Sequence, residues 1–370
     1  MELTTASNMS MEYTVRVTCM TYNQADFIVN TMDGFCMQDT QFPFVCVIVD
    51  DASTDGEQEV IQNYLEQNFD LNNQSLVRNE ETEDYVLTFA QHKNNSNCYF
   101  GVLFLKYNHF RKKEKPPYYV SWSQAKYQAY CEGDDYWTHP KKLQMQVDFL
   151  ESHPDYGLIY TDFLTYSQKE QKFIEWKYSR QADFNDMLIH NRVCTLTILI
   201  RTQILRDYNK EIKPIVRERK WQMGDYPLWL YSMTQAKAKF LPEVTGVYRK
   251  LESSASHFNA FDHIRNFYLD SFDVSFFFAK RFQVPKEIIQ AIARQEVDLL
   301  TKKAQENDAN LKFGLFKHMI KYRIFTIPYY ISAKKRSNKK IRKTCSLFHD
   351  IISTIRCRIA IRTRIKDLFN

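Results

Sequence analysis

The chain has 370 residues, of which 44% are hydrophobic and 25% charged, so it can bury a large core and is not disordered. Its length suits one large domain or two smaller ones. The net charge of +6 hides an asymmetry, because residues 317–370 carry 15 Lys and Arg against 2 Asp, a net of +13 that leaves −7 for residues 1–316.

The first 51 residues predict a strand, a helix and a second strand. Residues 13–19 alternate apolar and polar side chains, as a half-buried strand does. Residues 24–38 place their apolar side chains on one side of a helix. The run FVCVIV at 44–49 is continuously apolar and ends in Asp50 and Asp51, which is typical of a buried parallel strand that opens at a site.

The next elements continue the alternation of strands and helices. Thr54 and Glu57 have the spacing of a capping box, so a helix is expected to begin near them. Residues 100–107 and 127–132 read as strands, and 139–152 as an amphipathic helix. Alternation of this kind predicts an α/β sheet.

The second half of the chain predicts two more strands and then helices. The strands are expected at 158–166 and 193–201, and the pattern becomes helical from residue 262, with a helix over 287–300. Residues 72–98 are polar and predict no element. The expected fold class is α/β: a mixed, mostly parallel sheet flanked by helices, with a helical C-terminal extension.

Three carboxylates crowd the stretch YCEGDDYWTHP, namely Glu132, Asp134 and Asp135. Adjacent carboxylates repel one another unless a cation or a solvated turn relieves the repulsion. Motifs for a dinucleotide, a P-loop nucleotide, a zincin or a serine hydrolase are absent from the sequence. Carboxylates that hold a divalent cation against a diphosphate are one interpretation of this turn, and a solvated acidic turn is the other.

Four segments in order resemble the family 2 inverting glycosyltransferases with the GT-A fold. They are VTCMTYN (17–23), VIVDDASTD (47–55), CEGDDYW (131–137) and MGDYPLW (223–229), and the resemblance covers about 13–257. It implies a non-processive enzyme that transfers a sugar from a nucleotide-sugar, favoured as UDP-linked, to a hydroxyl of a glycan or lipid-linked acceptor. Metal-dependent single displacement and a place in polysaccharide biosynthesis are implied as well.

The resemblance implies roles for individual residues. Tyr22 would stack on the base, and Asp51 would accept a hydrogen bond from the uracil N3–H. The metal, Mn²⁺ or Mg²⁺, would be held by Asp134 and Glu132, with Asp134 the firmer ligand because Glu replaces the first Asp of the D-x-D motif. Asp225 would be the catalytic base. The implied nucleotide-sugar-binding residues are Thr21, Tyr22, Asn23, Asp50, Asp51, Glu132 and Asp134, and the implied metal ligands are Asp134, Glu132 and His257.

Three residues allow two interpretations each. His257 is either a metal ligand or an ordinary surface or core residue, and Trp137 and Trp229 either line the sugar site or pack in the core. The family's usual N-x-G…A-R-N segment is absent, so Arg111 or Lys126 would have to make the donor contacts of its arginine.

The expected division is a glycosyltransferase domain at 10–260, a helical extension at 261–330 and a basic amphipathic tail at 331–370. In the tail, residues 339–370 place apolar side chains on one helix face among many cations, so they are expected either to dock on an anionic membrane or to pack against protein. Scattered cysteines without a CxxC pair indicate a reduced compartment. The absence of a signal peptide or apolar span predicts a cytoplasmic protein that can be peripheral on the inner face of the cell membrane.

Two other functions remain open. A metal-dependent nucleotidyltransferase would also use carboxylates, but its phosphate-activating Gly- and Lys/Arg-rich loop is absent. A nucleic-acid-binding protein acting through the basic tail is the second alternative. The acidic body argues against it, and no nucleic-acid partner is expected.

Overall fold

The structure is a computed structural model and describes residues 13–73, 77–109, 125–175, 179–251 and 261–306. The chain divides into two compact units, Met1–His257 and Phe258–Asn370. Among the described residues, no helix is long and apolar enough to cross a membrane.

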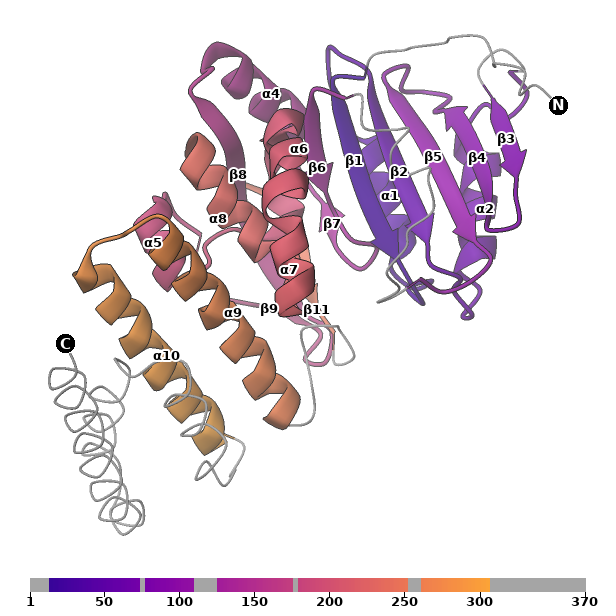
Figure 1. Cartoon of the computed structure of the whole chain (residues 1–370). Coiled ribbons are helices and arrows are strands. Elements are labelled where there is room, and N and C mark those ends of the chain that lie inside the picture. Colours follow the sequence, from indigo (N-terminus) through magenta and orange to yellow (C-terminus); the bar gives the residue numbers. More distant parts are fainter. Residues whose placement is uncertain (1–12, 74–76, 110–124, 176–178, 252–260, 307–370) are drawn as a thin grey trace, which may run out of the picture. The chain divides into compact units, whose positions relative to one another are not determined.

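The first unit is built on a mixed sheet whose strands run in the order β3-β4-β5-β2-β1-β6-β10-β8-β11-β7, with β9 paired to β8 (Figure 1). Its strands are β1 (Val15–Thr21), β2 (Phe44–Asp50), β3 (Arg78–Glu81), β4 (Tyr85–Gln91), β5 (Cys98–Leu105), β6 (Tyr127–Tyr130), β7 (Tyr136–Trp137), β8 (Tyr156–Ser167), β9 (Lys172–Ile174), β10 (Leu199–Arg201) and β11 (Lys237–Lys250). Its helices are α1 (Ile28–Cys36), α2 (Glu57–Asn68), α4 (Lys142–Ser152), α5 (Phe184–Ile189), the 3₁₀ helix η1 (Thr195–Thr197), α6 (Thr202–Glu211), α7 (Lys213–Arg219) and α8 (Tyr226–Gln235).

The centre of the sheet is parallel. Strand β1 pairs in parallel with β2 and with β6, and β2 pairs in parallel with β5. Antiparallel pairings extend the sheet on both sides, through β4 and β3 next to β5 and through β10 next to β6. The expected mixed sheet with flanking helices and a helical C-terminal region is therefore confirmed.

The main core lies between one face of the central strands and the helices α1, α2 and α4. Side chains from β1, β2 and β5 pack there against Phe35 of α1, Ile61 of α2 and Leu143 of α4, all fully buried. A smaller cluster on β2, β4 and β5 packs on the opposite face, around Val47 and Leu103. Burial on both faces explains why β2 reads as a continuous apolar run.

The parallel arrangement decides where a site can form. Thr21, the last residue of β1, pairs with Asp50, the last residue of β2, and Asp50 pairs with Phe104 near the end of β5. The segments that follow β1, β2, β5 and β6 therefore leave the sheet at the same edge, which we call the carboxyl edge. Ligands of open α/β sheets bind at such an edge.

The second unit contains the helices α9 (Phe261–Arg281) and α10 (Lys286–Glu306). The turn between them places Gln283 in a left-handed conformation with φ of 49°. Buried side chains from both helices, including Phe278 and Ile292, support the helical pattern expected from residue 262.

Candidate functional site

The loops after β1 and β2 are hydrogen-bonded to each other. The backbone N–H of Asn23 donates to Ser53 Oγ at 2.9 Å, and the N–H of Thr54 donates to Asn23 Oδ1 at 2.8 Å. Asn23 and Ala52 both have left-handed backbones, with φ of 54° and 61°. The two loops therefore form one unit with a specific, strained shape.

Glu57 lies beneath these loops and is fully buried. Its carboxylate accepts hydrogen bonds from Thr21 Oγ1, from the N–H of Gln24 at 2.9 Å and from Ser53 Oγ at 2.8 Å. The expected capping box of Thr54 and Glu57 is wrong, because α2 begins after Gly56, whose φ of 89° suits glycine. The side chain of Glu57 turns to the loops instead.

An open pocket of about 800 Å³ lies beside the joined loops. The loop after β1 contributes Tyr22, whose side chain is largely exposed, and the loop after β2 contributes Ala52, Ser53 and Thr54. The end of β5 and the segment after it form the other wall, with Lys106, Tyr107 and Asn108 among the lining residues. A planar aromatic ring beside polar loop groups is suited to stacking on a base.

The adjacent residues Asp50 and Asp51 have different surroundings. Asp50 is fully buried, and its Oδ2 accepts hydrogen bonds from Gln58 Nε2 and from the N–H of Ser53 at 3.2 Å. Asp51 Oδ1 accepts the N–H of His109 at 2.6 Å, and the Asp51 carbonyl accepts Asn108 Nδ2 at 3.0 Å. Asp50 thus supports its loop from within, while Asp51 joins the loops after β2 and β5.

The acidic turn that follows β6 is fixed by contacts from α1 and β11. Thr31 Oγ1 lies within hydrogen-bond distance of the carbonyls of Gly133, at 2.9 Å, and Asp135, at 2.6 Å. The N–H of Arg249 donates to Asp135 Oδ1 at 2.7 Å, and its guanidinium donates to the Asp134 carbonyl at 3.1 Å and to Asn30 Oδ1 at 2.9 Å. Asp135 is buried, so its carboxylate serves the turn itself.

Glu132 and Asp134 retain access to solvent, and their charges interact. Desolvation by the surrounding protein, together with the charges of Asp134 and Asp225, raises the pKa of Glu132 to about 7. Desolvation also raises the pKa of Asp134, although its own backbone N–H and Arg249 act in the opposite direction. A cation would relieve this crowding, so the pair fits a Mg²⁺ or Mn²⁺ ion whose other ligands are phosphate oxygens.

The third member that was expected for the metal, His257, lies outside the described residues. Within the described ranges, three or more His, Cys, Asp or Glu side chains do not gather in a group that could hold a metal ion. The described part of the chain therefore supplies two carboxylates, and a ligand such as a diphosphate would have to complete the coordination.

Asp225 stands before α8, where it is the N-cap. Its Oδ1 accepts the N–H of Tyr226 at 2.8 Å, and its Oδ2 accepts Thr195 Oγ1 at 3.0 Å. The side chain is partly exposed. Because its charge raises the pKa of Glu132, Asp225 lies within electrostatic range of the acidic turn, although 93 residues separate the two in sequence.

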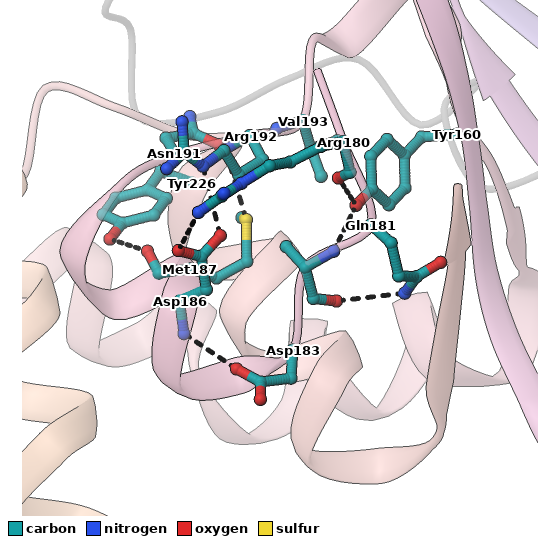
Figure 2. Close-up of polar contacts among 11 residues, drawn as sticks. Tyr160, Arg180, Gln181, Asp183, Asp186, Met187, Asn191, Arg192, Val193 and Tyr226 are labelled. Atoms are coloured by element: carbon teal, nitrogen blue, oxygen red, sulfur yellow. Dashed lines mark hydrogen bonds and ion pairs between the residues drawn. The ribbon is translucent and has the colours of Figure 1, made fainter. Parts of the chain in front are cut away.

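A polar network around α5 fixes the start of α8 (Figure 2). The hydroxyl of Tyr226 donates to the carbonyl of Met187 at 2.7 Å. Asp186 on the same helix accepts bonds from Arg180 at 3.0 Å and from Arg192 at 3.1 Å. The side chain of Asp183 caps α5 through the N–H of Asp186 at 2.8 Å. Sequence patterns did not indicate this support, since its members are scattered along the chain and follow no periodicity.

Two further sequence interpretations can be corrected. Trp137 and Trp229 are each only 1% exposed, and the Trp137 Nε1–H donates to the Leu196 carbonyl at 2.8 Å, so both pack in the core and do not line a sugar site. Lys126 precedes β6 at the opposite edge of the sheet, where it pairs with Glu151. It cannot replace the missing donor-binding arginine, and Arg111 lies outside the described residues.

Comparisons with known proteins agree with the sequence resemblance. Residues 17–86 match the model of glycosyl transferase family 2, which confirms the resemblance for that segment. Uncharacterized proteins of Mycobacterium bovis and Mycobacterium tuberculosis are 28% identical over 242 residues, which cover 63% of this chain and 58% of each relative. The matched part thus spans less than two thirds of those relatives.

Among solved structures, TarS of S. aureus in complex with UDP-GlcNAc is 16% identical, with a TM-score of 0.48, 88% of this chain covered and 80% of that chain. The mannosyltransferase PcManGT of Pyrobaculum calidifontis, in complex with GDP-Man and Mn²⁺, is 15% identical, with a TM-score of 0.47, 91% of this chain covered and 84% of that chain.

The close approach of the acidic turn to the first loop can be tested with Gly133→Ala. A Cβ at residue 133 would overlap Thr21 Oγ1 and Gln24 Oε1, so we expect the free energy of unfolding to fall by about 1–3 kcal/mol in urea titrations. Gly224→Ala is the matched control, because a Cβ there would meet no atom within 4 Å. Wild-type stability of Gly133→Ala would contradict the close contact.

Proposed function

We propose, from the glycosyl transferase family 2 match at residues 17–86, that this chain is a glycosyltransferase that uses a nucleotide-sugar donor. The observation that carries the proposal is the arrangement at the carboxyl edge. An open pocket beside Tyr22 adjoins one side of the site, and the solvent-accessible carboxylates Glu132, Asp134 and Asp225 interact at the other. These are the parts that a base, a metal-bound diphosphate and an acceptor hydroxyl require.

In this proposal the donor binds across the loops after β1, β2 and β6. Tyr22 stacks on the base, Asp51 accepts the N3–H of a uracil, and Thr21, Asn23 and Asp50 hold the shape of the loops. Glu132 and Asp134 would hold the divalent metal, with His257 as a further ligand. When bound, the ion supplies positive charge to the diphosphate leaving group.

Asp225 is the proposed base of an inverting single displacement. Its carboxylate takes the proton of the acceptor hydroxyl while that oxygen bonds to the anomeric carbon. The bond between this carbon and the phosphate oxygen breaks, and its electron pair leaves with the nucleoside diphosphate. The hydrogen bond from Thr195 holds one carboxylate oxygen and the Tyr226 N–H holds the other, so the carboxylate plane is fixed and each oxygen keeps a lone pair for a proton.

The acceptor class and the cellular place are proposals as well. We propose a hexosyl transfer to a glycan or lipid-linked hydroxyl in polysaccharide biosynthesis, by a cytoplasmic enzyme that docks on the inner face of the membrane. The division into 10–260, 261–330 and 331–370 belongs to the same proposal. The membrane contact is assigned to residues 339–370, which lie outside the described residues.

Asp134→Ala tests the diphosphate site. We expect UDP binding to lose its dependence on Mn²⁺ while uridine still binds, because only the metal contact is removed. Asp51→Ala should weaken uridine and UDP alike. Calorimetric titration with and without Mn²⁺ measures both variants, and an Asp134→Ala protein that binds UDP and Mn²⁺ like wild type would reduce the cluster to a solvated turn.

Asp225→Asn tests the base. The amide oxygen can still accept the Tyr226 N–H, so α8 keeps its cap, but the side chain cannot take a proton. We expect kcat to fall by roughly 10²–10⁴ with nearly unchanged donor affinity. Sugar transfer is measured at saturating donor, and wild-type turnover would remove Asp225 from the mechanism.

Deletion of residues 331–370 tests membrane docking. We expect the full chain to co-sediment with anionic liposomes but not with neutral ones, because each Lys or Arg near an anionic surface contributes about 1 kcal/mol. Salt should weaken the binding, and the deletion should abolish it. Recovery of the full chain in the supernatant with both kinds of liposome would refute docking.

A further inference from the structure

The strongest feature that the proposed mechanism leaves unused is the buried carboxylate of Glu57. It sits under two loops that line the pocket, and it is 0% exposed. We infer that Glu57 is a positioning residue, which holds the loops after β1 and β2 in the shape that binds the nucleoside part of the donor. This inference rests on the proposed function for the identity of the ligand.

The contacts of Glu57 connect the two loops through one carboxylate. Thr21 Oγ1 donates to Oε1, while the Gln24 N–H at 2.9 Å and Ser53 Oγ at 2.8 Å donate to Oε2. Thr21 and Gln24 flank Tyr22, which lines the pocket, and Ser53 lines it directly. Glu57 itself is not among the lining residues, so it acts on a ligand only through these loops.

Backbone strain shows why the loops need such support. A left-handed conformation costs a residue such as Ala52 roughly 1–2 kcal/mol, and Asn23, whose side chain tolerates it better, adopts it as well. Each stands immediately before a residue that Glu57 holds, since Gln24 follows Asn23 and Ser53 follows Ala52. Strain of this kind persists only where the surroundings enforce it.

The contacts favour a carboxylate at residue 57, because one carboxylate can accept from the Gln24 N–H and from both hydroxyls. Bonds to an ionised acceptor are stronger than bonds to a neutral one, so a glutamine would weaken the bonds from Gln24 and Ser53. Its NH₂ group could contact Thr21 only if that hydroxyl accepted and turned its proton to Gln24 Oε1, which lies 2.8 Å away. On balance the pKa of Glu57 is raised, because burial outweighs the bonds from Thr21, Gln24 and Ser53, which act in the opposite direction.

The experiment compares Glu57→Gln with Glu59→Gln in the full chain. Glu59 lies in the first turn of the same helix and is exposed, so its variant makes the same chemical change without touching the loops. Calorimetry measures the Kd of the best-bound nucleoside among uridine, guanosine and thymidine, and of its diphosphate with Mn²⁺. Amide hydrogen exchange is followed at 22–24 and 52–55 without ligand.

We expect Glu57→Gln to raise both Kd values at least tenfold and by the same factor, because the metal-dependent diphosphate contact stays intact. Amide exchange should accelerate in both loops and stay at the wild-type rate in the central strands. Glu59→Gln should behave like wild type in every measurement. A general loss of stability would instead accelerate exchange throughout the sheet, and this outcome would overturn the positioning role.

Failure of the inference can be told apart from failure of the proposed function. If wild type binds a nucleoside and Glu57→Gln binds it equally well, the inference is refuted and the function stands. If wild type binds no nucleoside or nucleotide, the function falls, and unchanged loop exchange in Glu57→Gln would overturn the support role as well. Should Glu57→Gln not fold, Ser53→Ala removes one of the three donors and is expected to raise the nucleoside Kd about threefold or more, while an unchanged Kd would refute the inference.

Discussion

The carboxyl edge of the sheet depends on carboxylates that are buried away from solvent. Asp50, Glu57 and Asp135 all lie at this edge with little or no exposure, and each accepts a hydrogen bond from a backbone N–H. A polar group is buried at low cost only where such donors satisfy it. Because these donors belong to the backbone, satisfying the three carboxylates fixes the path of the chain around them. The shape of the site is a consequence of hydrogen-bonding three buried carboxylates.

The other two acidic residues at this edge differ from these three, because both remain accessible to solvent. Glu132 and Asp134 keep contact with solvent and with each other's charge, and the pKa of each is raised. Their turn is held by Thr31 and by the guanidinium of Arg249, which bonds to a carbonyl and to Asn30. Among the described residues, neither of these two carboxylates accepts a bond from a Lys or Arg side chain, which suits them to bind a cation that arrives with a ligand.

The sequence predicted the central strands and helices because their periodicity is set by burial. The alternation at 13–19 and the apolar run at 44–49 correspond to β1 and β2. The hairpin of β3 and β4 was missed, since β3 is short, exposed and charged, as an edge strand is. Only Leu199–Arg201 of the strand expected at 193–201 forms, after a 3₁₀ turn. Short elements give too few residues for a period to show.

Sequence motifs pointed to candidate residues such as Asp51 and Asp134. They did not show the role of a residue whose function depends on contacts with distant parts of the chain. Proximity of Asp50 and Asp51 in sequence gave no indication that one would be fully buried. Glu57 read as a cap residue because capping depends on local spacing, whereas its bond to Thr21 joins residues 36 apart. Such long-range contacts leave no periodic trace in a single sequence.

The contact between Arg249 and Asn30 joins residues 219 apart, and this separation governs how the site can assemble. Relative to the 36-residue closure between Thr21 and Glu57, closing the longer loop costs about 1.6 kcal/mol more chain entropy. The loops after β1 and β2 can therefore order through a short chain segment, whereas the acidic turn is fixed only once β11, near the end of the first unit, is in place. A fragment that ends before Arg249 lacks the contacts that hold that turn, so residues 17–86, which match the family model, cannot form the site without the rest of the unit.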